Sequence, residues 1–145
     1  LGRGYDDGLI AALAVIDMLD RNPGKTMADL VRALPQTWQS PTMSPHCADE
    51  IKYAVVERIV KHYSGLYEQG AEIAGQRIAD VITVNGIRIV LDDGTWGLVR
   101  ASSNKPELVV VVESPTSEAN MRAIFADIDG LLSTQPEVGE YNQKI

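Results

Sequence analysis

The sequence predicts an α+β fold, in which a four-stranded antiparallel sheet carries helices on one face and is preceded by two further helices. Three observations predict this class. Helical periodicity of the apolar residues gives way to strand-like segments near residue 78, and it returns after residue 115. Asn85-Gly86, between two of these segments, is typical of a tight hairpin turn and makes the two strands antiparallel. A run of strands flanked by helices favours a sheet covered on one side.

The first predicted helix begins after Asp6 or Asp7, either of which can cap it, and it ends at Asn22-Pro23-Gly24. Its apolar residues cover a wide arc, so we expect this helix to need a partner surface or to cause self-association. A second, short helix is predicted from Thr26, because Asp29 follows three residues later in a capping-box pattern.

Pro35, Pro41 and Pro45 stiffen the segment that follows. This segment is predicted to be either a connector or a strand at the edge of the sheet, where proline is tolerated. We place a domain boundary here, which divides the chain into residues 1–35 and 36–145.

The second region is predicted to begin with a long helix from Cys47 to about Gln69, because apolar residues recur four apart along one stripe. A last helix is capped by Thr116 or Ser117, and the tail from Thr134 onward is expected to be loose. Between these helices, four strands are predicted as a meander, at Val81–Val84, Ile87–Leu91, Thr95–Arg100 and Glu107–Glu113.

The composition restricts the class of function. The 145 residues, 45% hydrophobic and 23% charged, are typical of one folded globular domain. Thirteen Lys and Arg against twenty Asp and Glu give a net charge of −7, the wrong sign for a surface that follows nucleic-acid phosphates. No apolar run approaches the roughly 20 residues that span a bilayer. We therefore expect no nucleic-acid and no membrane partner.

The single cysteine, Cys47, excludes an intramolecular disulfide, and the expected compartment is the reducing cytoplasm. Cys47 is interpreted as a structural thiol, and the alternative is a thiol whose pKa is lowered by a nearby helix N-terminus. Asp92-Asp93 are interpreted as turn residues, and the alternative is a cation site. His46 and His62 lack metal-ligand spacing, so no metal site is predicted in this chain.

The segment from Arg100 to Pro106 is the one candidate site. A guanidinium at a strand end, the hydroxyls of Ser102 and Ser103, the Asn104 amide and the Lys105 ammonium supply the donors that a phosphate needs. A solvated hairpin loop of ordinary loop residues is the alternative that composition alone favours.

The run from Gly94 to Glu113, which contains Trp96 and Arg100-Ala101-Ser102-Ser103-Asn104-Lys105-Pro106 before an apolar strand, resembles the phosphate-binding segment of the α-D-phosphohexomutases. It is most similar to the phosphomannomutase/phosphoglucomutase branch. Asn85-Gly86-Ile87-Arg88 matches a hairpin of that family, and Gly4–Leu13 is similar to the start of the last helix of its third domain.

The resemblance implies that the chain is the C-terminal part of a four-domain enzyme, with residues 1–35 closing domain 3 and residues 36–145 forming domain 4. In that family, hexose 1-phosphate and hexose 6-phosphate interconvert through an enzyme phosphoserine and a hexose bisphosphate. The catalytic serine loop and the Mg²⁺ loop belong to other domains. The implied partners are therefore hexose phosphates, the bisphosphate and the remaining domains, and the 145-residue chain is expected to be inactive alone.

The resemblance also assigns the site residues. Arg100 and Ser102 match the family's Arg and first Ser, whereas Ser103 and Asn104 stand where the family has Asn and Thr, and Lys105 falls where the family varies. Arg100 is the expected anchor of the substrate phosphate that is not reacting, and no catalytic residue is assigned.

Two other classes stay open from the residues alone: a free-standing α+β regulatory domain that binds a ligand, and a purely structural or interaction domain. Within the family, a phosphoglucosamine mutase is disfavoured, because that branch has Gly-Thr-Glu-Pro where this chain has Ser103-Asn104-Lys105-Pro106. The sequence does not distinguish mannose from glucose.

Overall fold

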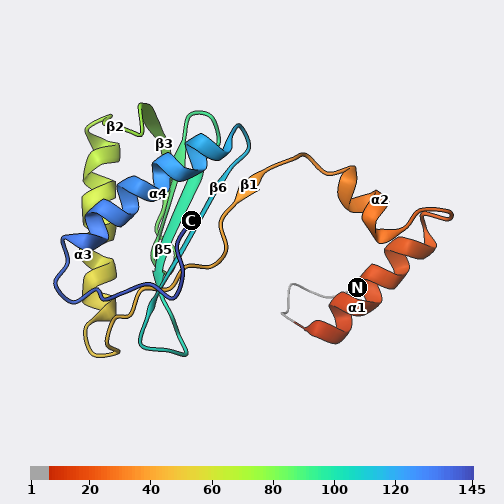
Figure 1. Ribbon diagram of the computed structural model, residues 1–145, viewed down its shortest axis with the longest axis horizontal. Coiled ribbons are helices and arrows are strands. Elements are labelled where there is room, and N and C mark those ends of the chain that lie inside the picture. The colour runs from red at the N-terminus through yellow and green to blue at the C-terminus, as the bar shows by residue number, and fades with distance from the viewer. Residues whose placement is uncertain (1–6) are drawn as a thin grey trace. The chain divides into compact units, whose positions relative to one another are not determined.

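The computed structural model describes residues 7–145, which divide into two compact units, the first ending at Gln36 and the second running from Thr37 to Ile145. Figure 1 shows the helices and strands of both units. No helix within residues 7–145 is long and apolar enough to cross a lipid bilayer.

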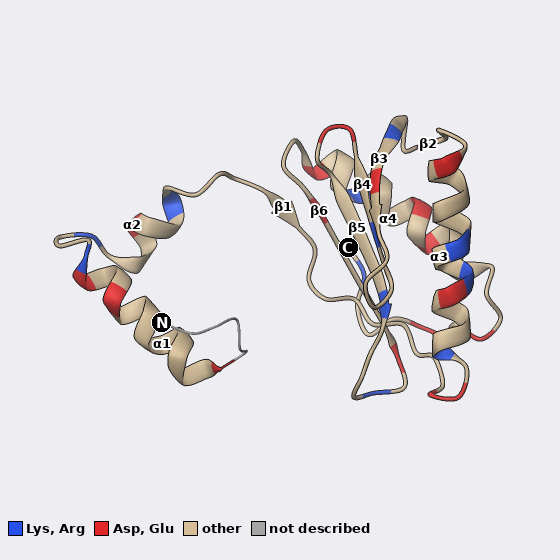
Figure 2. Cartoon of the chain, turned by 180° about the vertical axis from the view of Figure 1, so that it is seen from behind, with Lys and Arg blue, Asp and Glu red and all other residues tan. Residues whose placement is uncertain are grey.

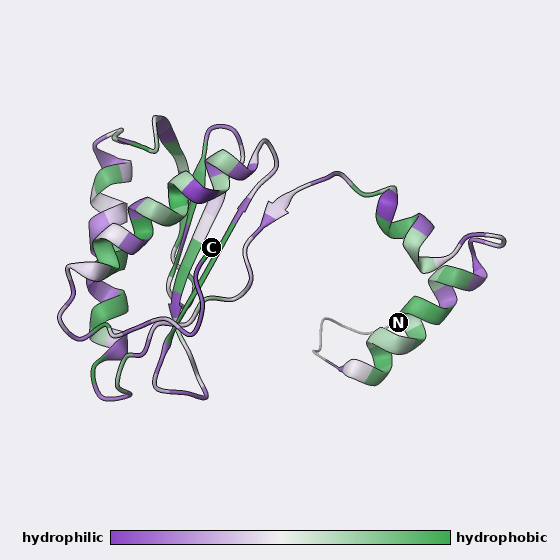
Figure 3. Ribbon diagram, in the orientation of Figure 1, coloured by the Kyte–Doolittle hydropathy of each residue, from purple (hydrophilic) through white to green (hydrophobic). Residues whose placement is uncertain are grey.

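The first unit contains two capped helices, α1 (Gly8–Asp20) and α2 (Met27–Arg32). The Asp7 carboxylate caps α1 by accepting from two backbone N–H groups of the first turn, and Asp6 lies outside the described residues. Thr26 and Asp29 form the predicted capping box. Neither helix buries a residue, and Figure 3 shows hydrophobic residues along most of α1.

The second unit is built on an antiparallel sheet of six strands, not the four that the sequence predicts. The strand order is β1-β6-β5-β4-β3-β2, so the predicted meander forms the centre and one further strand is added at each edge. The strands are β1 (Trp38–Gln39), β2 (Glu72–Ile73), β3 (Gln76–Ile82), β4 (Ile87–Leu91), β5 (Trp96–Ala101) and β6 (Leu108–Ser114).

Both additional strands have two residues, too few to show an alternating pattern. β1 lies in the proline-containing segment after Pro35, which the sequence predicts to be either a connector or an edge strand. β2 forms a hairpin with β3 through Ala74 and Gly75, whose φ angles are 52° and 73°. Alanine rarely adopts a positive φ, so this turn lacks the signal that Asn85-Gly86, at 54° and 116°, carries in the predicted hairpin. The sequence therefore predicts this strand only over Val81–Val84, whereas β3 begins at Gln76, directly after the turn, and ends at Ile82.

Two helices, α3 (Lys52–Glu68) and α4 (Glu118–Ser133), cover one face of the sheet. The Tyr63 hydroxyl of α3 donates to Asp127 of α4 at 2.8 Å. A Cβ on Gly97 of β5 would lie 2.5 Å from Cδ1 of Ile128, so α4 crosses this strand where no side chain fits. Acidic and basic residues are interspersed along α3 (Figure 2). The core takes alternate residues of the central strands, including Ile87, Ile89, Leu91, Val99, Ala101, Leu108, Val110 and Val112.

The tail after α4 packs on the second unit, contrary to the loose segment that its polar sequence predicts. The Gly139 N–H donates to the His46 carbonyl at 2.8 Å, and the Asn142 N–H donates to the Ser44 carbonyl at 3.1 Å. Side chains hold it as well, because the Ser44 N–H donates to the Asn142 side-chain oxygen at 2.7 Å and Val138, Tyr141 and Ile145 pack against the core.

Candidate functional site

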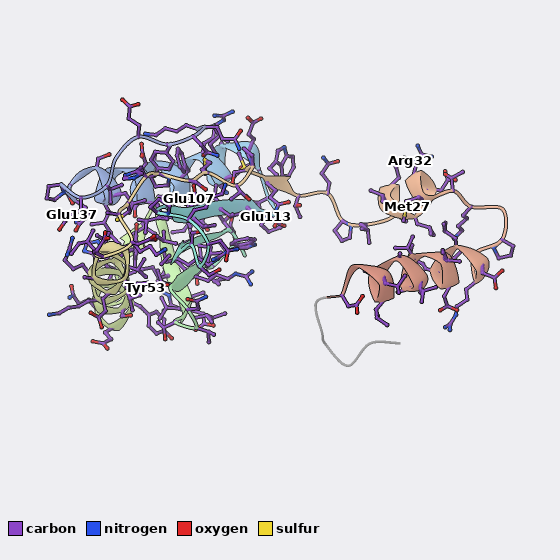
Figure 4. All side chains as sticks on the ribbon, turned by 90° about the horizontal axis from the view of Figure 1, so that it is seen from below. Met27, Arg32, Tyr53, Glu107, Glu113 and Glu137 are labelled. Carbon is purple, nitrogen blue, oxygen red and sulfur yellow. The ribbon has the colours of Figure 1, made fainter. Side chains whose placement is uncertain are left out.

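The candidate site is the loop of residues 102–106, which joins the neighbouring strands β5 and β6. Ala101 pairs with Leu108 at the end of the ladder, and the Ser102 N–H donates to the Glu107 carbonyl at 3.0 Å. The loop therefore leaves the sheet as the closed end of a hairpin. Figure 4 labels Glu107, the residue that ends it.

Arg100 lies at the base of the 102–106 loop, opposite Val109 in the ladder. Its neighbours Val99 and Ala101 face the core, so the alternation of β5 directs Arg100 to the sheet face that α3 and α4 do not cover. The side chain is half-buried and donates to the Ala101 carbonyl at 3.1 Å. No carboxylate within residues 7–145 forms an ion pair with it, so most of its five N–H donors are free for a ligand.

The turn of Gly86 packs directly against Arg100. A Cβ on Gly86 would lie 2.7 Å from Cβ of Arg100 and 2.4 Å from the Val99 carbonyl oxygen. Because Gly86 also has a φ of 116°, a side chain is excluded here both by space and by backbone conformation. The β3–β4 hairpin thus supports the strand that carries Arg100.

The remaining predicted site residues lie together on the loop but in different environments. Ser102 is 8% exposed, and its Oγ accepts from the Asn104 N–H at 3.4 Å. Ser103, Asn104 and Lys105 are exposed, and the Ser103 hydroxyl donates to the Asn104 side-chain oxygen at 3.4 Å. Ser102 therefore shapes the loop, while the next three side chains face solvent.

The sequence does not single out Lys52, a charged residue within the long helix predicted from Cys47. Its side chain is 4% exposed, and its Nζ donates to the Lys105 carbonyl at 2.9 Å. The adjacent Pro106 carbonyl accepts from the Cys47 N–H at 2.9 Å. Lys52 immediately precedes Tyr53, which is exposed (Figure 4). The sequence gives no sign that Lys52 is buried, since its burial depends on the 102–106 loop folding over it.

The other chemistry-bearing residues have structural roles. Cys47 is fully buried, and burial raises the pKa of its thiol, the opposite of a reactive cysteine. Asp93 accepts hydrogen bonds from Thr95, Thr116 and Asn120. Burial alone would raise the pKa of Asp93, but these hydrogen bonds hold it well below its ordinary value.

The described residues do not suit a metal ion: within 7–145, no three His, Cys, Asp or Glu side chains gather in a way that could hold one. The candidate site is thus a hairpin loop with an arginine at its base, and it lies at one end of the antiparallel sheet of an α+β domain.

Comparison with known proteins gives this domain its family. The family described as Phosphoglucomutase/phosphomannomutase, C-terminal domain, matches residues 47–131, so the chain belongs to the phosphoglucomutase/phosphomannomutase family. A solved structure of a family protein from Burkholderia thailandensis has the same fold, with a TM-score of 0.65 and 24% identity over 95% of this chain and 26% of that chain. The resemblance carried by the 94–113 run is therefore confirmed.

Curated relatives are mutases of several sugar phosphates. The chain is 31% identical to a probable phosphoglucosamine mutase of Methanothermobacter thermautotrophicus and covers 22% of it, with 77% of this chain aligned. It is 31% identical to a phosphopentomutase of Thermococcus kodakarensis, covering 23% of that protein and 77% of this chain. It is 29% identical to a phosphomannomutase/phosphoglucomutase of Pseudomonas syringae, and the alignment covers 87% of this chain and 26% of that protein. The chain thus spans about a quarter of these relatives' lengths.

Proposed function

We propose that this chain is the C-terminal, substrate-binding part of a phosphohexomutase that interconverts hexose 1-phosphate and hexose 6-phosphate, of mannose, glucose or both. The observation that carries the proposal is the 102–106 loop, whose backbone is anchored while its donor side chains remain uncommitted. The alternative of a free-standing regulatory domain is disfavoured, because the family match covers the helices and the sheet that build this loop.

Arg100 is the proposed anchor of the phosphate. A planar guanidinium binds two phosphate oxygens at once, and one of its hydrogen bonds is already used to orient it. Ser103, Asn104 and Lys105 add exposed donors beside it, and Ser102 keeps the loop in shape through the Asn104 N–H. This set binds a phosphate group without reading the sugar to which it is attached.

A phosphate site that ignores the sugar fits a mutase, in which the substrate must bind in two orientations. The non-reacting group is the 1-phosphate in one half-reaction and the 6-phosphate in the other. In our proposal, the phosphoserine, the bisphosphate chemistry and the Mg²⁺ site belong to the remaining domains of the parent enzyme, in the cytoplasm. The names of the relatives extend from hexosamine to pentose phosphates. In our proposal, the sugar is selected outside this loop.

The experiment is steady-state kinetics of the complete mutase with a hexose 1-phosphate and with a hexose 6-phosphate. Charge-assisted hydrogen bonds contribute about 1.5 to 3 kcal/mol each, so Arg100→Ala should lower kcat/KM by roughly 10²-fold or more in both directions. Ser102→Ala should lower it only several-fold, since a neutral hydroxyl contributes about 1 kcal/mol. The 145-residue chain alone should show no turnover.

An Arg100→Ala enzyme within about twofold of the parent in kcat/KM would reduce the loop to a plain hairpin. Turnover by the 145-residue chain alone would contradict the assignment of the chemistry to other domains.

We also propose that the first unit mediates self-association of this chain. Leu9, Leu13, Ile16, Val31 and Leu34 are exposed on a unit with no buried residue in either helix. Light scattering should give a larger mass than the monomer for the full chain and a monomeric mass for residues 37–145, which hold the buried core. Equal monomeric masses would contradict this proposal.

A further inference from the structure

Lys52 is a buried charge in an unfavourable place. It lies in the first turn of α3, where the helix dipole disfavours a cation, and Ile51 before it provides no side-chain cap. Burial of an ammonium group is costly unless the charge is paired and hydrogen-bonded. Helix stability therefore does not explain why a lysine, rather than an apolar residue of similar length, occupies this position.

The two hydrogen bonds of Lys52 show what the ammonium group does. Its Nζ donates to the Asp49 carboxylate at 2.6 Å and to the carbonyl oxygen of Lys105 at 2.9 Å. The first bond offsets the charge locally. The second reaches the candidate phosphate loop, 53 residues away in the sequence, and joins it to the start of α3.

The Lys105 carbonyl accepts from Lys52 Nζ and, at 2.8 Å, from the Glu107 N–H, and these two bonds together fix which way this peptide group of the loop points. Since the Lys52 side chain is 4% exposed, the carbonyl that it binds is directed toward the protein interior. A carbonyl oxygen turned the other way would repel a bound phosphate, because both are hydrogen-bond acceptors. The Pro106 carbonyl is held in the same way by the Cys47 N–H at 2.9 Å. Two consecutive carbonyls are thus kept away from the ligand side.

We propose that Lys52 is a positioning residue of the phosphate site, an inference that rests on the proposed function. It binds the 102–106 loop from the buried side, removes an acceptor from the surface that meets the phosphate, and fixes the segment that carries Asn104 and Lys105. Lys52 itself does not contact the substrate.

The test compares Lys52→Met with the parent 145-residue chain. Methionine fills a similar volume without the ammonium group. Titration with inorganic phosphate, followed by amide chemical shifts of Ser103 to Lys105, should give a Kd raised about tenfold. Backbone hydrogen exchange at the Asn104 and Glu107 amides should accelerate about tenfold, while the β4 amides keep their rates.

Val55→Ala is the matched control, because Val55 is fully buried in the same helix but belongs to the core cluster. It should lower the free energy of unfolding while leaving the phosphate Kd and the loop exchange rates unchanged. A Lys52→Met Kd within twofold of the parent, or an equal loss of affinity in Val55→Ala, would overturn the inference.

The two proposals can fail separately. If the parent chain binds no phosphate, the phosphate function fails for this chain, and the exchange rates alone decide the role of Lys52. Faster exchange at Asn104 and Glu107 in Lys52→Met then still establishes that Lys52 holds the loop. Unchanged exchange overturns it.

Discussion

Two connections between neighbouring strands of the same sheet have similar residues but differ in whether their polar side chains have partners within the protein. The turn of residues 92–95 joins β4 to β5, and the 102–106 loop joins β5 to β6. Both contain charged and hydroxyl side chains. In the turn these groups bind one another, whereas in the loop most of them face solvent.

The Asp93 carboxylate shows how completely the 92–95 turn is satisfied. It accepts from the hydroxyls of Thr95 and Thr116 and from the Asn120 amide, and the Thr95 hydroxyl also lies 2.8 Å from Ser114 Oγ. The turn is thereby fastened to the N-terminus of α4. Its polar residues stabilise the fold and are not available to a ligand.

The 102–106 loop is anchored through its backbone, by Cys47 and Lys52, and its side chains are left free. Residue types alone therefore do not separate a turn whose polar groups are paired from a loop whose polar groups are open to a ligand. What separates them is whether the polar side chains already have partners within the protein.

The largest expected effect that distinguishes the two regions is on stability. Asp93→Ala removes the acceptor of several hydrogen bonds and should lower the free energy of unfolding by about 2 kcal/mol, without changing phosphate affinity. Urea denaturation and phosphate titration of the same variant measure both quantities. If Asp93→Ala is as stable as the parent, the hydrogen bonds of the 92–95 turn contribute no more to stability than those of the 102–106 loop.

The pH dependence of stability should also come from the turn. Because the pKa of Asp93 is lowered in the folded protein, its stabilising contribution is complete above the unfolded pKa of about 4 and is lost as the pH falls through the folded value. The stability difference between the parent and Asp93→Asn should therefore shrink by up to about 1 kcal/mol per pH unit below pH 4. Urea unfolding at pH 7, 4 and 3 checks this, and a constant difference would contradict it.

The smallest expected effect on stability is in the loop. Asn104 is exposed, so Asn104→Ala should change the free energy of unfolding by less than about 0.5 kcal/mol. Its phosphate affinity should nevertheless fall several-fold, since an amide donor is lost. A stability loss comparable to that of Asp93→Ala would show that the loop is built like the turn.

Local chemistry in the sequence predicts much of this fold. Asn85-Gly86 predicts a turn with two positive φ angles, and Thr26 with Asp29 predicts a capping box, because each depends only on nearby residues. The edge strand β2 escapes prediction because Ala74 adopts a positive φ that its residue type does not indicate. The packed tail is held in part by backbone groups, to which residue types give no guide, and its few apolar residues show no periodic pattern.

The candidate site is predictable only in part. The resemblance of the Arg100–Pro106 segment identifies which residues to consider, and the structure places Arg100 at the end of β5 and the others on the loop that follows. It does not identify Lys52, because the burial of its ammonium group arises only when α3 and the loop come together from distant parts of the chain. Such long-range contacts leave no periodic or local signal in a single sequence.

The most direct measurement of the central claim is an amide chemical-shift map of the 145-residue chain titrated with a hexose 6-phosphate. We predict that the largest shifts fall on residues 102–105 and on the Arg100 side chain, and that Arg100→Ala abolishes them. The 92–95 turn should not respond. Shifts centred elsewhere on the sheet, or a response that survives Arg100→Ala, would contradict the assignment of the phosphate site to this loop.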